Sequence, residues 1–478
     1  MTTTNPTAPP LSPPRDRLLD RRHLPVVVGV IALVTLTAFE NRAVQTILPV
    51  IVRDLDGWTL FGAATGATLV TFTVATAWAG GWTDRLGPRP VLLGGLGLFA
   101  LAQVVSALAP TMGVFVAGRA VSGAAEALVD TTLMVLVAQA LPESLRAKVF
   151  ASFAAAWILP SLLGPGVAGG IEAVAGWRFV FIGPLLVALP AVLLLRPALR
   201  AGGRAAGTPP GVDPRARGRL AASVLLAAGL AVTTFSAPLL ATPASRAVGL
   251  AAVLGGAGVV LLAAVRALPA GTLRLAPGVP AVVGLRLLTS AAFTGVGAVL
   301  PLMLVTTHRV SPAVAGISLS VTGVMWAAGS WANSIDRVQD RVGAAVRTRV
   351  GGLLIAAGAM GPLLLALDVV PIAVGLAGWA ASATGMGILS PTLSTELLAA
   401  APVAERGRAS AAQGLAVSTG VALQTGLIGA VVAWFGPAMD GPRFAALMAV
   451  GVVVALTVAA GGGRVGRLTS ADAGALVP

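Results

Sequence analysis

The chain alternates between long apolar segments and short polar connections along almost its whole length. Segments rich in Ala, Val, Leu and Gly are separated by connections marked by Pro, Gly or charge, such as "DRLGPRP" and "DRVQDRVG". About 20 apolar residues in an α-helix cross the hydrocarbon core of a bilayer. The pattern therefore predicts fourteen membrane-spanning helices, at roughly 25–50, 57–80, 90–109, 112–137, 146–171, 177–196, 219–238, 246–265, 281–306, 313–334, 348–367, 371–395, 410–434 and 443–461.

The composition supports a membrane protein and excludes several other classes. Of the 478 residues, 56% are hydrophobic and only 10% are charged, whereas soluble domains are roughly a quarter charged. Cysteine is absent, the two histidines lie far apart, and the single lysine, Lys148, is not in a phosphate-binding loop. We therefore expect no metal, no cofactor and no enzymatic activity. The net charge of +14 comes without a nucleic-acid-binding motif, so no nucleic acid partner is expected.

The distribution of cationic residues predicts the orientation. With the N-terminus inside and the spans alternating, 25 of the 32 cationic residues, Arg286 among them, fall inside and five fall outside. Only Arg42 and Arg119 are then assigned to the spans themselves. Positively charged loops are typical of the cytoplasmic side. This asymmetry predicts that both termini, in tails at 1–23 and 464–478, are cytoplasmic.

A weak internal repeat predicts two related halves. "AGGWTDR", "ILPVIV" and "RAKVFASFAAAW" are echoed, roughly 250–260 residues later, by "AGSWANSIDR", "VLPLMLV" and "RGRASAAQGLAV". Two homologous halves around a pathway are typical of transporters. We therefore expect an all-α transmembrane fold of two pseudo-symmetric six-helix bundles plus two inserted helices. The N-terminal bundle would cover 24–197, the basic linker and inserted helix pair 198–279, and the C-terminal bundle 280–463.

Ionisable residues interrupt two of the predicted spans. The first span contains Glu40 and Arg42 in "AFENRAVQTILPVIV", and the fourth contains Arg119, Glu126 and Asp130. The spacings of seven and four in the fourth span place its three charges on one helix face. Charged groups inside a membrane are costly, face the interior of the bundle and mark ion or substrate pathways. Glu40 can be accommodated by pairing with Arg42 or with Arg119, or by taking up a proton.

Two further motifs carry Gly, Pro and charge at defined spacings. In "GGWTDRLGPRP", Asp84 lies at a helix end where it can accept hydrogen bonds, and Gly87 permits a tight turn. In "GPGVAGG" of the fifth span, Gly and Pro can kink a helix or allow close packing. The residues of the two motifs are Gly80, Asp84, Arg85, Gly87 and Arg89, and then Gly164, Pro165, Gly169 and Gly170.

Aromatic and amide side chains within the predicted spans are candidates for a substrate cavity. Such side chains can line a binding site, although core packing is the alternative for each of them. They are Gln45, Trp157, Trp326, Trp379 and Gln413.

These motifs resemble those of the major facilitator superfamily, specifically its fourteen-helix drug:proton antiporter branch. The 80–90 loop resembles the signature between helices 2 and 3 of that family. Arg119 and Gly123 match its helix-4 motif, with Ser122 in place of the usual Gln. "FENRAVQTILP" resembles the helix-1 motif, with Glu40 in place of Asp and Arg42 in place of Thr.

The fifth span departs further from the family pattern. "GPGVAGG" resembles the helix-5 antiporter motif but has three residues between the pairs instead of two, and Pro160 stands where Gly is usual. "GWRFVF", at 176–181, is similar to the start of the family's helix 6.

The resemblance implies a proton-coupled exporter of drugs or other small amphipathic compounds. Such a protein works by alternating access in the plasma membrane, and we expect a monomer. Helices 1 and 4 are neighbours in this family, which brings Glu40 and Arg119 together. The five charges within the spans sum to −1, so one carboxylate, Glu40, Glu126 or Asp130, would take up the coupled proton. A static salt-bridge network is the alternative role. A transporter dedicated to one metabolite, in either direction, and a non-transporting sensor or scaffold are the other functions considered.

Overall fold

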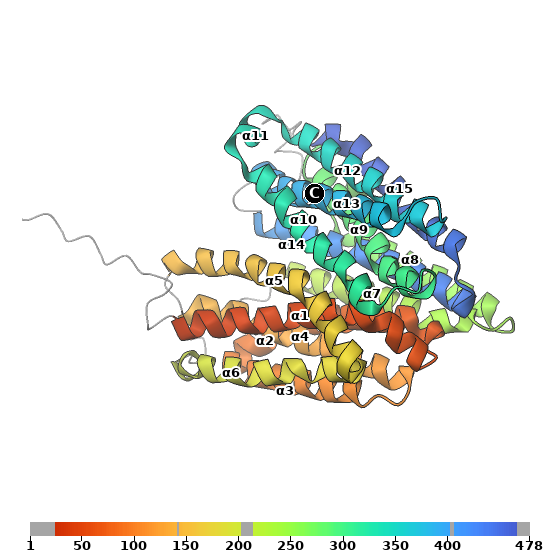
Figure 1. Ribbon diagram of the computed structural model, residues 1–478. Helices are drawn as coiled ribbons and strands as arrows, with labels where there is room; N and C mark the ends of the chain where they lie inside the picture. Colours follow the sequence, from red (N-terminus) through yellow and green to blue (C-terminus); the bar gives the residue numbers. More distant parts are fainter. Residues whose placement is uncertain (1–23, 141–142, 202–213, 402–405, 466–478) are drawn as a thin grey trace, which may run out of the picture.

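The computed structural model describes residues 24–140, 143–201, 214–401 and 406–465. Within these ranges the chain is helical and forms no strand. The predicted tails at 1–23 and 464–478 and the linker before the inserted pair fall largely outside the described residues. Figure 1 shows two groups of helices lying one above the other.

Each predicted span coincides with a long helix. The first half consists of α1 (Leu24–Asp54), α2 (Phe61–Leu86), α3 (Pro88–Ala107), α4 (Met112–Ala140), α5 (Glu143–Ala175) and α6 (Gly183–Ala201). The second half consists of α9 (Val279–Thr306), α10 (Pro312–Ser334), the short α11 (Asp336–Arg341), α12 (Ala344–Ala366), α13 (Ile372–Ala400), α14 (Arg406–Phe435) and α15 (Gly441–Gly461). Between the halves come α7 (Pro214–Ser236) and α8 (Arg246–Ala267).

Twelve of the described helices are long and apolar enough to cross a membrane. Of the other three, α11 is short, and α5 and α7 contain shorter apolar stretches, Leu159–Ala175 and Val224–Leu240. Helix α5 continues through Pro160 and Pro165 without a break. The chain is therefore an all-helical, multi-pass membrane protein.

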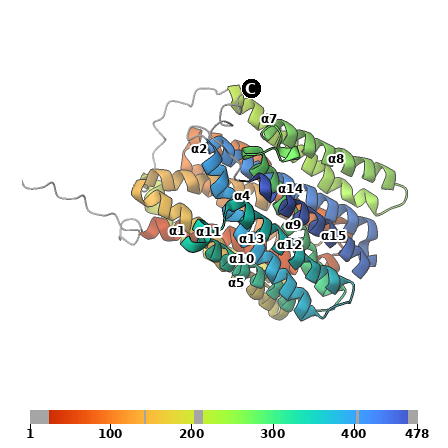
Figure 2. The same ribbon diagram turned by 90° about the horizontal axis from the view of Figure 1, so that it is seen from above.

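The inserted helices lie beside both halves. Helix α7 packs against α8 and against α2 of the first half and α14 of the second, and Figure 2 shows the pair along one side of the molecule. Small residues allow this approach, since a Cβ added at Gly66 would lie 2.9 Å from the Thr234 side chain. The α7–α8 pair therefore packs beside the contact between α2 and α14.

The two halves touch most closely toward the end of the bundle where α1 ends. A Cβ added at Gly62, near the start of α2, would lie 2.4 Å from the Cα of Gly429 in α14. A Cβ at Gly316, early in α10, would lie 2.9 Å from the Pro165 carbonyl oxygen of α5. Toward the opposite end, where α1 begins, the ribbons of the two halves diverge (Figure 1).

Candidate functional site

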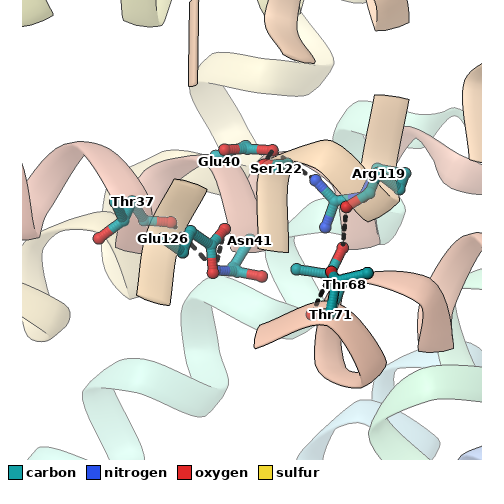
Figure 3. A network of polar contacts seen from close by, with 8 residues as sticks. All are labelled: Thr37, Glu40, Asn41, Thr68, Thr71, Arg119, Ser122 and Glu126. Atoms are coloured by element: carbon teal, nitrogen blue, oxygen red, sulfur yellow. Dashed lines mark hydrogen bonds and ion pairs between the residues drawn. The ribbon is translucent and has the colours of Figure 1, made fainter. Parts of the chain in front are cut away.

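A buried ion pair joins α1 to α4. The Arg119 guanidinium donates a hydrogen bond to Oε1 of Glu40, and the Ser122 hydroxyl donates to the same oxygen at 2.6 Å, as Figure 3 shows. The Glu40 and Arg119 side chains are only 3% and 4% exposed. Two charges this far from water are stable only when they are paired and hydrogen-bonded. Of the partners that the sequence left open for Glu40, the structure selects Arg119.

Glu126 is held by an amide and not by a cation. The Asn41 side-chain nitrogen lies 3.2 Å and 3.3 Å from the two carboxylate oxygens of Glu126, and it also donates to the Thr37 carbonyl (Figure 3). Glu126 is 6% exposed, and none of the ion pairs between described residues includes it. A buried carboxylate without a cation carries a large desolvation cost unless it is neutralised.

Helix α4 presents several polar residues to α1 from one face. Arg119, Ser122 and Glu126 all reach side chains of α1 from one face of α4. Asp130 follows one turn after Glu126 on the same face and is half-buried. The site is therefore a row of one cation, one hydroxyl and two carboxylates along one helix.

The close packing of α2 on α4 fixes this row in place. A Cβ added at Gly123 would lie 2.1 Å from the Thr68 carbonyl oxygen, so only glycine fits there. The Thr68 hydroxyl donates to the Arg119 backbone carbonyl at 3.2 Å (Figure 3). The helix-4 glycine therefore has a packing role directly beside the ion pair.

Arg42 points away from Glu40, toward α5. Its Nε donates to the Ser161 hydroxyl and its Nη1 to the Gln45 side-chain oxygen, both at 3.2 Å. Arg42 is half-buried, and Gln45 is exposed although it lies within a membrane-spanning helix. Among the described residues, its side-chain partners Ser161 and Gln45 are both neutral.

A second arginine within the helices was misassigned from the sequence. Counting Arg286 among the loop arginines was wrong, because α9 begins at Val279 and places Arg286 inside the helix. Its Nη1 donates to the Ser390 hydroxyl of α13 at 2.6 Å, and its buried Nε has no hydrogen-bond partner among the described residues. The signal was available, since the predicted span 281–306 already contained this residue.

A comparison with protein families decides the classification. The family model described as Major Facilitator Superfamily matches residues 30–425. The chain belongs to this superfamily. The match runs from α1 into α14 and so includes the α1–α4 site.

Relatives in the superfamily are named as multidrug transporters, one of them for efflux. A probable multidrug-efflux transporter of Mycobacterium tuberculosis is 34% identical over 188 residues, which is 39% of this chain and 40% of that protein. The multidrug transporter protein MdtP of Bacillus subtilis is 29% identical over 175 residues, or 37% of this chain and 32% of that protein. The chain thus matches well under half the length of these relatives.

Solved structures share the fold at low sequence identity. A peptide transporter of the POT family in complex with sulfate has a TM-score of 0.64 at 16% identity, covering 92% of this chain and 95% of that one. A bacterial homologue of the human lysosomal transporter Spinster, in an inward-facing and unoccupied conformation, has a TM-score of 0.62 at 15% identity. It covers 92% of this chain and 97% of that one. These likenesses show the superfamily fold.

The loop between α2 and α3 forms the tight turn that the sequence predicted. Gly87 has φ of +84°, a conformation that favours glycine, and α3 begins at the next residue. Arg85 and Arg89 are exposed. The side chain of Asp84 and the surroundings of Gly80 lie outside what the structure describes.

Two residues of the α5 motif, Gly164 and Pro165, lie at its contacts with α1 and α10. Gly164 faces α1, where an added Cβ would lie 3.4 Å from the Cβ of Arg42, and the Pro165 carbonyl approaches α10. Gly169 is buried, whereas Gly170 faces open space. The α5 motif therefore lies beside Arg42 and at the boundary between the halves.

The aromatic and amide side chains that are candidates for a substrate cavity differ in exposure. Trp379 is 1% exposed and stacks on Phe293 with ring centroids 4.8 Å apart, so it is a core residue. Trp326 is half-buried and meets Phe293 edge-on at 5.5 Å. Gln413 is half-buried and donates to the Ser394 hydroxyl at 3.0 Å. The Trp157 side chain lies outside the described residues.

Proposed function

We propose that this chain is a proton-coupled antiporter that exports drugs or other small amphipathic organic compounds by alternating access. The names of the relatives support drug export as the class of activity. The buried carboxylates of the α1–α4 site support proton coupling. The protein would act as a monomer in the plasma membrane.

The observation that carries proton coupling is the contrast between Glu40 and Glu126. Glu40 has a cation, Arg119, at hydrogen-bonding distance, whereas Glu126 has only the amide of Asn41. In a dry site the unpaired carboxylate is the one that holds a proton at least cost. We therefore assign the proton in this conformation to Glu126, with Asp130 as its route toward water.

Coupling between protonation and conformational change would follow if Arg119 can pair with either carboxylate, Glu40 or Glu126. Arg119 and Glu126 share one face of α4, and Glu40 faces them from α1. When Glu126 releases its proton, its new negative charge competes with Glu40 for the guanidinium. That competition changes how α1 sits against α4, and it provides the link between protonation and the arrangement of the halves.

We further propose fourteen spans with both termini in the cytoplasm. All fourteen long helices, α5 and α7 included, would cross the bilayer. The end where α1 begins would then be cytoplasmic, and the divergence of the halves there corresponds to an inward-facing state (Figure 1). Reporter fusions within 197–218 test this topology, because an external location of this linker contradicts it.

Transport in proteoliposomes tests the mechanism. A panel of cationic, neutral and anionic amphipathic compounds is offered to vesicles with an imposed pH gradient. An antiporter accumulates its substrate on the acidic side and a symporter on the alkaline side, whichever way the protein is inserted. Accumulation on the acidic side is expected, and Glu126→Gln should abolish it.

A matched carboxylate serves as the control for this experiment. Glu172 lies near the end of α5 and takes no part in the α1–α4 site. Glu172→Gln should transport like the unaltered protein. Gradient-driven accumulation that survives Glu126→Gln would show that the coupled proton is carried elsewhere, and accumulation on the alkaline side would refute antiport.

A further inference from the structure

The charges of the α1–α4 site leave one cation without a counter-charge. Arg119 is neutralised by Glu40, and the remaining carboxylates, Glu126 and Asp130, project from α4. Arg42 lies on the side of α1 that faces α5, and none of the ion pairs between described residues includes it. The guanidinium is always charged in proteins.

The described residues around Arg42 leave its charge uncompensated. Its two hydrogen-bond partners, Ser161 and Gln45, are both uncharged. Hydroxyl and amide groups orient a guanidinium but do not neutralise it, and a planar guanidinium matches a carboxylate or phosphate through paired hydrogen bonds. The guanidinium is therefore oriented toward an anion that none of the ion pairs between described residues supplies.

Arg42 also lies where the two halves meet. Its partner Ser161 packs on α10 of the second half, where a Cβ added at Gly323 would lie 2.8 Å from the Ser161 Cβ. Gln45 is exposed, so this stretch of α1 borders accessible space. A compound carried by alternating access must contact both halves at such a boundary.

Aromatic surface is available within one helical turn of this point. Trp326 follows Gly323 by three residues on α10, which places it on the same side of the helix. It is half-buried and packs edge-on against Phe293. The second half therefore offers an aromatic surface close to the point where Ser161 holds Arg42.

We propose that Arg42 binds the anionic group of the transported compound, so that the substrates are amphipathic organic anions or zwitterions whose apolar part packs on Trp326. This inference rests on the proposed transport function and specifies its substrate class. Arg42, Ser161 and Gln45 would form the head-group subsite, contributed entirely by the first half.

Ligand-induced thermal stabilisation of the purified protein tests the proposal without any gradient. The probes are three compounds of similar size and shape: 2-naphthoate, 2-naphthamide and 2-naphthylmethylammonium. We expect 2-naphthoate to raise the melting temperature most. Arg42→Gln should weaken naphthoate binding by roughly tenfold to a hundredfold, the range for losing a hydrogen bond to a charged group. Binding of 2-naphthamide should change little.

Two further variants separate binding from folding. Arg42→Lys keeps the charge but loses the planar fork, so it should retain part of the naphthoate preference. Arg53→Gln removes an exposed arginine three turns further along the same helix and should bind naphthoate like the unaltered protein. If Arg42→Gln does not fold, the comparison of Arg42→Lys with Arg53→Gln still decides the outcome.

Several results would overturn the inference. Preference for the ammonium probe, absence of any naphthoate effect, or equal naphthoate binding by Arg42→Gln each contradicts it. Equal stabilisation by chloride or acetate would assign Arg42 to a small inorganic or solvent anion instead of the substrate. Because the assay needs no proton gradient, a failure of proton coupling leaves these outcomes unchanged. A failure here still allows gradient-driven transport of cationic or neutral compounds.

Discussion

Removing Arg119 should destabilise the protein in a strongly pH-dependent way. In Arg119→Gln, Glu40 stays buried at 3% exposure without its cation. Breaking a buried pair by removing one partner costs about 3–5 kcal/mol. Glu40 can limit that cost by taking up a proton, and the limit depends on pH.

The largest possible loss of stability is the free energy of protonating Glu40, with the unfolded chain as the reference state. A glutamate there titrates near pH 4.3, so protonating it costs about 3.7 kcal/mol at pH 7 and about 1 kcal/mol at pH 5. The folded variant then binds one proton more than the unfolded one, and its stability falls as pH rises. Relative to the unaltered protein, Arg119→Gln should lose about 3.7 kcal/mol at pH 7 and only about 1 kcal/mol at pH 5.

Denaturant unfolding of the detergent-solubilised variants at pH 5, 6 and 7, followed by tryptophan fluorescence, measures these values. Glu40→Gln provides the contrast, because the stranded Arg119 cannot lose its proton. Only Glu126 can then supply a negative charge, by releasing its proton, so the loss of stability should not increase as pH rises. The double variant removes both charges and should lose less than the sum of the two single losses. A loss in Arg119→Gln that is equal at pH 5 and pH 7, or additive losses in the double variant, would refute a buried, mutually neutralising pair.

The remaining predictions concern transport and packing. Glu40→Gln should insert and bind substrate but lose gradient-driven transport, while substrate-for-substrate exchange continues; full gradient-driven transport in proteoliposomes would remove Glu40 from the coupling role. Glu126→Gln should be at least as stable as the unaltered protein, since it deletes a buried carboxylate that has no cation, and a lower denaturation midpoint would indicate an unrecognised ion pair. Asp84→Asn should impair transport with little loss of folded protein, and normal uptake would leave the 80–90 loop as a turn only. Gly123→Ala should lower the yield of folded protein, because its Cβ would lie 2.1 Å from the Thr68 carbonyl oxygen; an unchanged yield would mean that α2 can shift.

The helices were predictable from the sequence because the signal in a membrane chain is strong and local. A run of about 20 apolar residues has few alternatives to a helix in a bilayer. The ends of the helices were less predictable, because several helices extend past their apolar part into polar or charged residues. Helix α4 extends to Ala140, and α13 extends to Ala400. Hydropathy marks the apolar part of a helix, whereas hydrogen bonds decide where it ends.

The partners of the charges were only partly predictable. The spacing on α4 predicted a shared face for Arg119, Glu126 and Asp130, which the structure confirms for the first two through their contacts with α1. The pairing of Glu126 with Asn41 could not be predicted, because it depends on the rotation of α1 relative to α4. Packing between helices sets that rotation, and the hydrophobic periodicity of a single helix does not record it.

The polar triplet of α1 is explained by the position of this helix between its neighbours. Successive residues of a helix point about 100° apart, so Glu40, Asn41 and Arg42 cannot share one partner. Glu40 and Asn41 contact α4, and Arg42 contacts α5. Three consecutive residues span about 200° of the helix circumference, so they all avoid hydrocarbon only when the lipid-facing side is narrow. Because α1 also packs against α6, α9 and α10, all three positions face protein or the space between the halves.

The same enclosure makes α1 sensitive to charge on two sides at once. Neutralisation at α4 and anion binding at Arg42 would both act on this helix, and this gives a physical route for coupling proton and substrate.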